Sequence, residues 1–142
     1  MIVLDTNVVS EFMKQQPNPI VVDWLQSQLS ENVFTTAITV FEIQHGLNVL
    51  SDGERKRGLI HQFELAMQHD FAGRILDFDQ AAAIVAARIS AEYKRQGQGA
   101  DVRDMQIAGI AVAKGWALAT RNTKDFRLSG AKLTDPWQHS PA

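Results

Sequence analysis

The chain opens with Met1-Ile2-Val3-Leu4-Asp5-Thr6-Asn7-Val8-Val9-Ser10-Glu11, and this stretch decides the class of fold. Residues 1–4 form a short apolar run, which favours a buried strand that ends at Asp5. A helical pattern follows over residues 6–14 and ends where Pro17-Asn18-Pro19 interrupts it. A buried strand that passes directly into a helix is typical of α/β proteins.

The same alternation continues to the end of the chain. Strands separated by helices predict a mainly parallel sheet with helices on both faces. No repeat, low-complexity tract or linker interrupts the pattern, so we predict one α/β domain over residues 1–142. Further strand patterns cover residues 32–36, 74–78, 116–120 and 131–134, and helical patterns cover residues 19–29, 38–50, 54–68, 80–95 and 102–114. Around the middle of the helix at 80–95, the residues that we expect to pack in the core are Ile84, Val85, Ala87, Arg88 and Ile89.

Composition excludes several classes of protein. The 142 residues contain no cysteine, which rules out disulfides, thiolate nucleophiles and cysteine-based zinc or iron–sulfur sites. The longest stretch without charged or strongly polar residues, at 81–87, is far too short to span a membrane. The first residues lack the basic segment of a signal peptide. We therefore expect a cytoplasmic protein with no membrane partner.

The formal net charge of −2 conceals an uneven distribution. Residues 1–54 carry one base and seven acids, whereas residues 55–142 carry thirteen bases and nine acids. Between residues 114 and 132 there are five bases and one acid. Part of the surface could therefore bind a polyanion, although an uneven spread of charge also arises by chance.

Three acidic residues lie where strands end or helices begin. Asp5 ends the first strand, and Glu42 and Asp104 lie in the first turns of the helices at 38–50 and 102–114. Ligands of open α/β sheets bind beyond the carboxyl ends of the strands, so the three carboxylates could converge there. Such a cluster requires protonation or a cation, and its oxygen ligands suit Mg²⁺ or Mn²⁺ better than zinc. Bound Mg²⁺ can polarise a phosphoryl oxygen and lower the pKa of a water molecule.

Each acid also has a purely structural explanation. Asp5 can cap the first helix, and Thr39 with Glu42 matches a capping box in which the glutamate reaches back to a backbone N–H. Asp104 can complement a helix dipole, with Asp101 as the cap. Taken singly, each acid is better explained by capping, and only the three together favour a metal site.

A fourth polar cluster follows the strand at 116–120. Asn122 and Asp125 can form a turn and a cap. In the functional interpretation, Asn122 lies beside the carboxylates and Thr120 donates a hydrogen bond to one of them. Nearby basic residues would then contact phosphates along the edge of the site, and these candidates are Arg121, Lys124 and Arg127.

These residues resemble the PIN-domain family, and within it the VapC-type toxins of the FitB-like branch. The resemblance covers nearly the whole chain in the right order, in the stretches 2–11, 37–46, 71–79, 104–113 and 119–123. It implies an α/β/α sandwich around a parallel sheet, with acidic residues in one pocket at its edge. Family members of this type are Mg²⁺- or Mn²⁺-dependent endoribonucleases. They are usually homodimers, sometimes within larger complexes, and a VapB-like antitoxin that also binds operator DNA inhibits them.

The resemblance also implies roles for individual residues. Asp5 and Asp104 would be the main metal ligands, and Glu42 would bind a metal directly or through water. Asn7 and Thr120 are the supporting polar positions. Relatives often carry Asp where this chain has Asn122, whose amide contributes no charge, and Asp125 lies a whole helical turn further on. We therefore expect one firmly held Mg²⁺ and a second recruited by the RNA phosphate.

The function that we expect is hydrolysis of RNA by a metal-activated water, leaving a 5′-phosphate and a 3′-hydroxyl. Two alternatives stay open: a non-catalytic PIN-like module that binds RNA or protein, and a nuclease directed at DNA. The chain has no G-x-S-x-G, P-loop or H-E-x-x-H motif. Apolar residues in 17–29 and 54–68 could contact an antitoxin or a second copy, although ordinary core packing also explains them.

Overall fold

The computed structural model describes residues 1–141, and residue 142, the last of the predicted domain, lies outside the described residues. A parallel sheet of five strands, in the order β3-β2-β1-β4-β5, forms its centre. The central strand β1 pairs with β2 and β4, which places Ile2 opposite Val33 on one side and Ala117 on the other. The strands are β1 (Ile2–Leu4), β2 (Val33–Thr36), β3 (Ile75–Leu76), β4 (Ala117–Ala119) and β5 (Leu133–Thr134).

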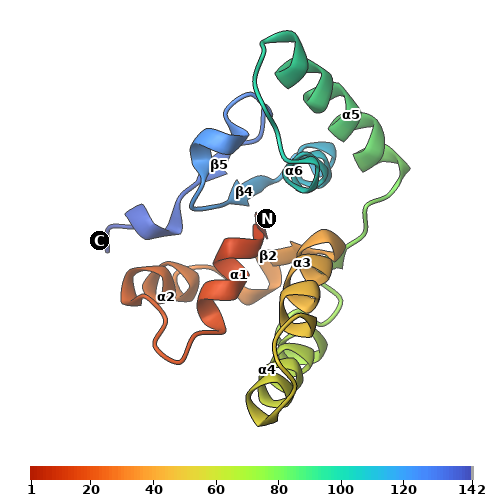
Figure 1. Cartoon of the computed structure of the whole chain (residues 1–142). Coiled ribbons are helices and arrows are strands. Elements are labelled where there is room, and N and C mark those ends of the chain that lie inside the picture. Colours follow the sequence, from red (N-terminus) through yellow and green to blue (C-terminus); the bar gives the residue numbers. More distant parts are fainter. Residues whose placement is uncertain (142) are drawn as a thin grey trace.

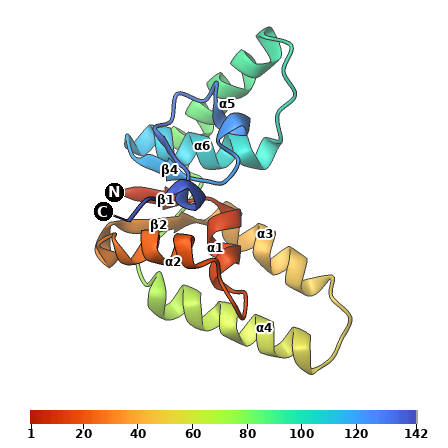
Figure 2. The same cartoon turned by 90° about the vertical axis from the view of Figure 1, so that its left-hand side faces the viewer.

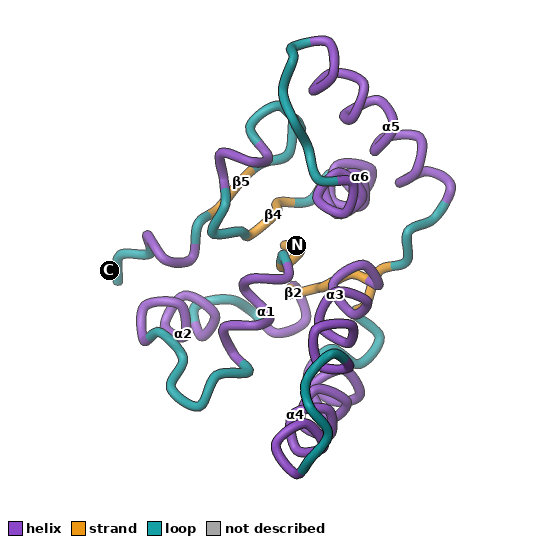
Figure 3. The backbone as a smooth tube through the Cα atoms, in the orientation of Figure 1, coloured by secondary structure: helices purple, strands orange, loops and turns teal. Residues whose placement is uncertain are grey.

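Helices cover both faces of this sheet, which confirms the predicted α/β/α sandwich. The first four helices lie on one side and the last two on the other (Figure 1, Figure 2). Figure 3 shows the strands, in orange, between these two layers of helices. The helices are α1 (Thr6–Phe12), α2 (Pro19–Gln26), α3 (Ala37–Asn48), α4 (Glu54–Leu65), α5 (Gln80–Arg95) and α6 (Val102–Lys114). Four short turns complete the chain: η1 (Ser30–Asn32), the π-helical η2 (Ala66–Asp70), η3 (Thr123–Phe126) and η4 (Pro136–Gln138).

The core lies on both sides of the sheet because side chains alternate along each strand. Ile2 and Leu4 pack with the helices α1 to α4, and Val3 packs with α5 and α6. The predicted strand patterns at 74–78, 116–120 and 131–134 overestimate the length of β3, β4 and β5. The helical pattern at 54–68 divides into α4 and η2. None of the helices in residues 1–141 is long and apolar enough to cross a membrane.

The packing of α5 on α6 corrects one prediction. Ile84, at 63% exposure, and its neighbours Ala87 and Arg88 lie outside the core. The buried face of α5 is instead Ala82, Ala86, Ile89 and Tyr93. Small residues decide this face, because Gly109 of α6 approaches the backbone of α5 so closely that a Cβ there would lie 2.6 Å from the Ala82 carbonyl oxygen.

Helix caps place several polar residues, and the predicted caps at Asp5 and Asp101 are confirmed, with one exception among the predicted caps. Asp5, Asp79 and Asp101 each accept a backbone N–H at the start of a helix. Gly115 ends α6 in the left-handed conformation, with φ of 71°. The exception is the expected Thr39–Glu42 capping box, which is wrong.

The cap of α3 is Thr36, which accepts the Thr39 N–H at 3.1 Å. The helix therefore begins at Ala37, before the predicted start, and Glu42 lies in its second turn instead of its first. This position leaves the Glu42 carboxylate free of the helix backbone.

Candidate active site

A pocket of about 430 Å³ lies beyond the carboxyl ends of β1 and β4, where an open α/β sheet binds its ligands. Its walls come from the ends of these two strands and from the helices α1, α3 and α6. The pocket brings together four of the predicted residues, Asp5, Glu42, Asp104 and Asn122, with the supporting residue Asn7. Its other lining residues are Thr6, Ser10, Glu11, Lys14, Arg121 and Trp137.

Asp5 is buried at the base of the pocket and is held through both carboxylate oxygens. The Thr6 N–H donates to Oδ1 at 2.8 Å, and the Thr120 hydroxyl donates to Oδ2 at 2.7 Å. Asn7 donates to the same Oδ2 at 3.3 Å. Both predicted supporting residues therefore contact the carboxylate and fix its orientation.

The Glu42 carboxylate is held by Thr6, the first residue of α1. The Thr6 hydroxyl donates to Glu42 Oε1 at 2.8 Å and lies 3.0 Å from the Thr39 hydroxyl. Arg103 Nη1 lies 3.9 Å from Glu42 Oε2. Thr6 thus links the carboxylates of β1 and α3, donating to Asp5 through its backbone and to Glu42 through its side chain.

The pocket disfavours the charged form of the Asp104 carboxyl group. Burial raises its pKa to about 7, and the charges of Asp5, Asp101 and Glu42 add to the shift. Burial also raises the pKa of Asp5, although the Thr120 and Thr6 hydrogen bonds oppose the increase. Repulsion between carboxylates in a partly desolvated pocket is the condition that a bound cation relieves.

The pocket atoms that could coordinate a metal are carboxylate and amide oxygens. Such oxygen ligands fit a divalent ion of the Mg²⁺ type. Within residues 1–141, however, no group of three or more His, Asp or Glu side chains could hold a metal ion as they stand. Glu42 is engaged by Thr6 and Arg103. Among the neighbouring charges, Asp5 raises the pKa of Asp104 most, so these two carboxylates are the pair whose repulsion a bound cation would relieve.

The fourth cluster contributes less to the pocket than the sequence predicts. Asn122 precedes η3, and its backbone N–H donates to the Thr120 hydroxyl at 3.1 Å. Asp125 is exposed and does not line the pocket; its backbone carbonyl accepts from the Tyr93 hydroxyl at 2.7 Å. Of the three basic candidates, Arg121 lines the pocket, whereas Lys124 and Arg127 are exposed outside it.

Five pocket residues were not predicted from the sequence, and one of them, Thr6, directly follows Asp5. Three of them, Ser10, Glu11 and Lys14, continue the face of α1 that begins at Asn7, so helical spacing was the signal that could have found them. The fifth, Trp137, comes from η4, and its ring centroid lies 5.0 Å from the central carbon of the Arg121 guanidinium. No local pattern connects that residue to a pocket built mainly from the first half of the chain.

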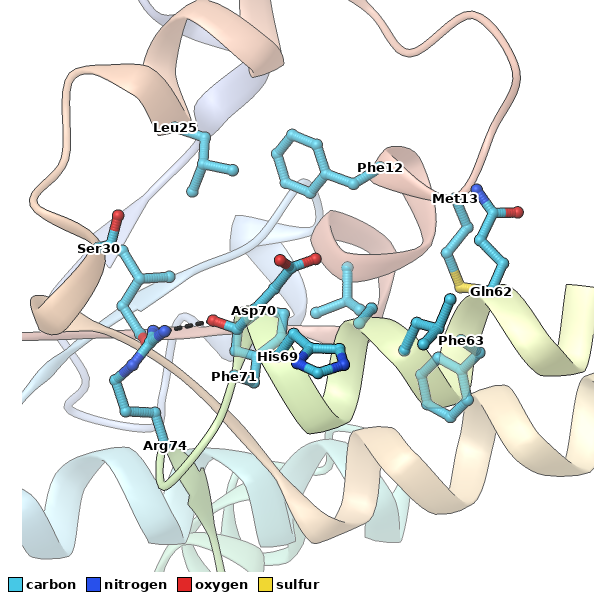
Figure 4. Close-up of a pocket in the computed structure, with 14 residues that line it drawn as sticks. Phe12, Met13, Leu25, Ser30, Gln62, Phe63, His69, Asp70, Phe71 and Arg74 are labelled. Carbon is cyan, nitrogen blue, oxygen red and sulfur yellow. Dashed lines mark hydrogen bonds between the residues drawn. The ribbon is translucent and has the colours of Figure 1, made fainter.

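A second hollow, of about 720 Å³, lies apart from this pocket between α1, α2 and α4 (Figure 4). Its walls are mainly apolar and include Phe12, Leu25 and Phe63. Arg74 donates to the Asp70 carbonyl at its edge. It contains none of the predicted site residues, but apolar parts of the segments 17–29 and 54–68 do line it.

Comparison with known proteins assigns the class. A model of the PIN domain matches residues 2–130. The chain therefore belongs to the PIN-domain family, a family of nucleases that generally use divalent metal ions.

Within that family, similar proteins confirm the resemblance to VapC and FitB toxins. Toxin FitB of Neisseria gonorrhoeae is 39% identical over 137 residues, which cover 96% of this chain and 99% of FitB. VapC ribonuclease Y4jK of Sinorhizobium fredii is 38% identical over 138 residues, covering 97% and 99% of the two chains. Plasmid stability protein StbB of Pseudomonas syringae pv. tomato is 36% identical with the same coverage.

Two solved structures share the fold over its whole length. The crystal structure of FitAcB from Neisseria gonorrhoeae matches with a TM-score of 0.90 and 39% identity, covering 98% of this chain and all of the other. The structure of FitAB bound to an IR36 DNA fragment matches with a TM-score of 0.91 and 38% identity, covering 99% of both chains.

Proposed function

We propose that this chain is a metal-dependent endoribonuclease and the toxin of a type II toxin–antitoxin pair. The observation that carries the proposal is the shared pocket of Asp5, Glu42 and Asp104 at the carboxyl edge of the sheet. Membership of the PIN-domain family and similarity to a protein named VapC ribonuclease support an RNA substrate.

Asp5 and Asp104 would hold Mg²⁺ or Mn²⁺, and Glu42 would act through a water molecule. A cation bound there polarises a phosphoryl oxygen and lowers the pKa of a water ligand. Thr120, Asn7 and the Thr6 N–H keep the Asp5 oxygens in one orientation, so the carboxylate is ready before substrate arrives.

The substrate backbone would enter beside Arg121, the basic candidate that lines the pocket. Its guanidinium suits a phosphate oxygen. Hydrolysis by water breaks the P–O3′ bond and leaves a 5′-phosphate on one fragment and a 3′-hydroxyl on the other. Asn122 adds no charge, so one cation would be held firmly in the free protein and a second would arrive with the RNA.

We also propose a VapB-like antitoxin partner that binds operator DNA, in line with the FitAB structure bound to DNA. A homodimer of this chain, working in the cytoplasm, would be the toxin half of that complex. Co-expression with the product of a small adjoining gene should give a complex that binds DNA and no longer cuts RNA. A purified complex that cuts RNA as fast as the free chain would contradict this part of the proposal.

Incubation of the purified protein with total RNA tests the activity, with Mg²⁺ and then with EDTA. We expect fragments with 5′-phosphate ends only when Mg²⁺ is present. Asp104→Asn should give none, and Asp52→Asn, a matched change at an exposed carboxylate between α3 and α4, should cut like the wild type. Equal cleavage by Asp104→Asn and the wild type would overturn the assignment.

A further inference from the structure

A second polar hollow, of about 530 Å³, adjoins the carboxylate pocket. The two spaces share the side chains of Glu11, Lys14, Arg121 and Trp137. The outer wall of this polar hollow is formed by the stretch Gln16-Pro17-Asn18-Pro19, where α1 is followed by α2. An RNA strand that leaves the carboxylate pocket past Arg121 would therefore enter this hollow next.

The wall between the two spaces is a stacked pair. The Arg121 guanidinium lies over the Trp137 ring, with 5.0 Å from its central carbon to the ring centroid. The backbone N–H of Trp137 donates to the Asp135 carboxylate at 2.9 Å, which holds the turn that carries the residue, and the indole itself packs against the hydrophobic core. Two residues on, His139 Nε2 lies 3.0 Å from Asp23 Oδ2 of α2. Arg121 itself is exposed, so its flat cationic group has a supported face and an open face.

The charges in this hollow are nearly balanced. Glu11 is only 5% exposed, and its two oxygens accept from Lys14 at 2.9 Å and from the Asn18 N–H at 3.0 Å. Lys14 forms an ion pair with Glu11, and the charge of Arg121 also acts on Glu11, although Arg121 forms no ion pair of its own within residues 1–141. Two prolines and an indole supply flat apolar surface around these groups. This chemistry suits an uncharged planar ring next to a phosphate better than it suits a second phosphate.

We propose that a nucleobase adjacent to the scissile phosphate stacks on the open face of Arg121, making a base–Arg121–Trp137 sandwich. This inference rests on the proposed ribonuclease function. Proteins bind unpaired bases by stacking them on aromatic rings or on guanidinium planes. Trp137 is a positioning residue here, since it acts by holding Arg121 flat, and Arg121 contacts the base.

The test uses a short labelled RNA that the wild-type protein cuts, and matched RNAs with one base removed on either side of the cut. Removing the base that stacks should lower kcat/KM roughly tenfold to hundredfold for the wild type. Arg121→Ala and Trp137→Leu should lower kcat/KM by a similar factor on the intact RNA. They should show no further loss on the RNA that lacks this base, because the same interaction is already missing.

Arg121→Lys separates stacking from charge. It keeps the positive charge and loses the planar group, so it should behave like Arg121→Ala toward the missing base while keeping the salt dependence of the wild type. Lys114→Ala is the matched control, because Lys114 lies 5.6 Å from the ring centroid of Trp116 before the start of β4, at the end of this strand opposite to the carboxylate pocket. Lys114→Ala should leave kcat/KM for the cleavage of both RNAs unchanged.

A binding measurement adds a readout that is independent of cleavage. In the inactive Asp104→Asn background, a short RNA should quench tryptophan fluorescence, and Trp137→Phe should remove most of that change. If Arg121→Ala lowered kcat/KM by the same factor on the intact RNA and on the RNA that lacks the base, the sandwich would be overturned and the proposed function would still stand. Absence of any cleavage by the wild type would overturn the proposed function itself.

Discussion

Thr120 donates a hydrogen bond of 2.7 Å to Asp5, although 115 positions separate the two residues in the sequence. The bond exists because β1 and β4 are neighbouring parallel strands and both residues follow the last residue of their strand. Thr120 is completely buried and also accepts the Asn122 N–H. One hydroxyl therefore joins the central carboxylate of the site to the segment that carries Asn122.

Loss of this hydroxyl should weaken metal binding. Thr120→Val keeps the shape of the side chain, leaves Asp5 Oδ2 without its shortest hydrogen bond, and should lower Mn²⁺ affinity about 10- to 100-fold, as found for partners that orient metal ligands. Thr120→Ser retains the donor and should bind Mn²⁺ nearly as the wild type does. Calorimetric titration measures both, and an unchanged affinity for the valine variant would show that the bond is not needed.

The raised pKa of Asp104 predicts a pH-dependent stability. In the unfolded chain this carboxyl titrates near its ordinary value of 3.8, whereas in the folded protein it titrates at about 7. Between these values the folded state holds a proton that the unfolded state has released, so the contribution to the free energy of unfolding is complete at low pH and is lost as the pH rises through 7.

Removal of that charge should therefore stabilise the metal-free protein. In EDTA at about pH 8, Asp104→Asn should exceed the wild type by about 1–2 kcal/mol, a value reduced because the side chain is partly exposed to solvent. The difference should shrink toward zero near about pH 4. Urea unfolding at the two pH values measures it, and a gain that grows in acid would contradict the sign.

Asn122 predicts the number of tightly bound metal ions. A neutral amide leaves the free protein with one firm cation, so Mn²⁺ titration should give one site per chain. Asn122→Asp adds a carboxylate to the pocket and should create a second site or tighten it at least about tenfold. Two equally tight sites in the unmodified chain would contradict the role given to this residue.

The contact of α5 with α6 predicts a large effect from one methyl group. A Cβ at Gly109 would lie 2.6 Å from the Ala82 carbonyl oxygen and 2.7 Å from the Ala86 Cβ, so Gly109→Ala should destabilise the protein by about 1–3 kcal/mol. Gly58 in α4 is the matched control, since nothing lies within 4 Å of a Cβ there. Gly58→Ala should stabilise by about 0.5–1 kcal/mol. Equal effects in thermal unfolding would contradict the packing described.

Much of the fold could be predicted because its signals are local. The apolar run before Asp5 and the glycine at 115 mark element boundaries without reference to the rest of the chain. The errors arise where a choice depends on a neighbour. Thr36 and Thr39 can both cap a helix, and pairing of β2 decides between them. Ile84 is the larger apolar residue, but close packing on Gly109 selects the alanine face.

The site divides in the same way. Asp5 and Asp104 stand next to element boundaries, so their positions could be predicted from the order of strands and helices. Trp137 could not, because its place beside Arg121 depends on how η4 docks on α2, far away in the sequence. Asp125 illustrates the opposite error: its spacing from Asn122 is suitable, but its side chain is exposed outside the pocket.

The most direct test of the central claim is single-turnover cleavage of one labelled RNA by the wild type, Asp104→Asn and Asp52→Asn, with folding of each checked by circular dichroism. The wild type and Asp52→Asn should cut at the same rate with Mg²⁺ and stop in EDTA. Asp104→Asn should be slower by more than about a hundredfold, beyond the loss typical of outer-shell partners. A folded Asp104→Asn protein that cuts at the wild-type rate, or wild-type cleavage that persists in EDTA, would contradict the account.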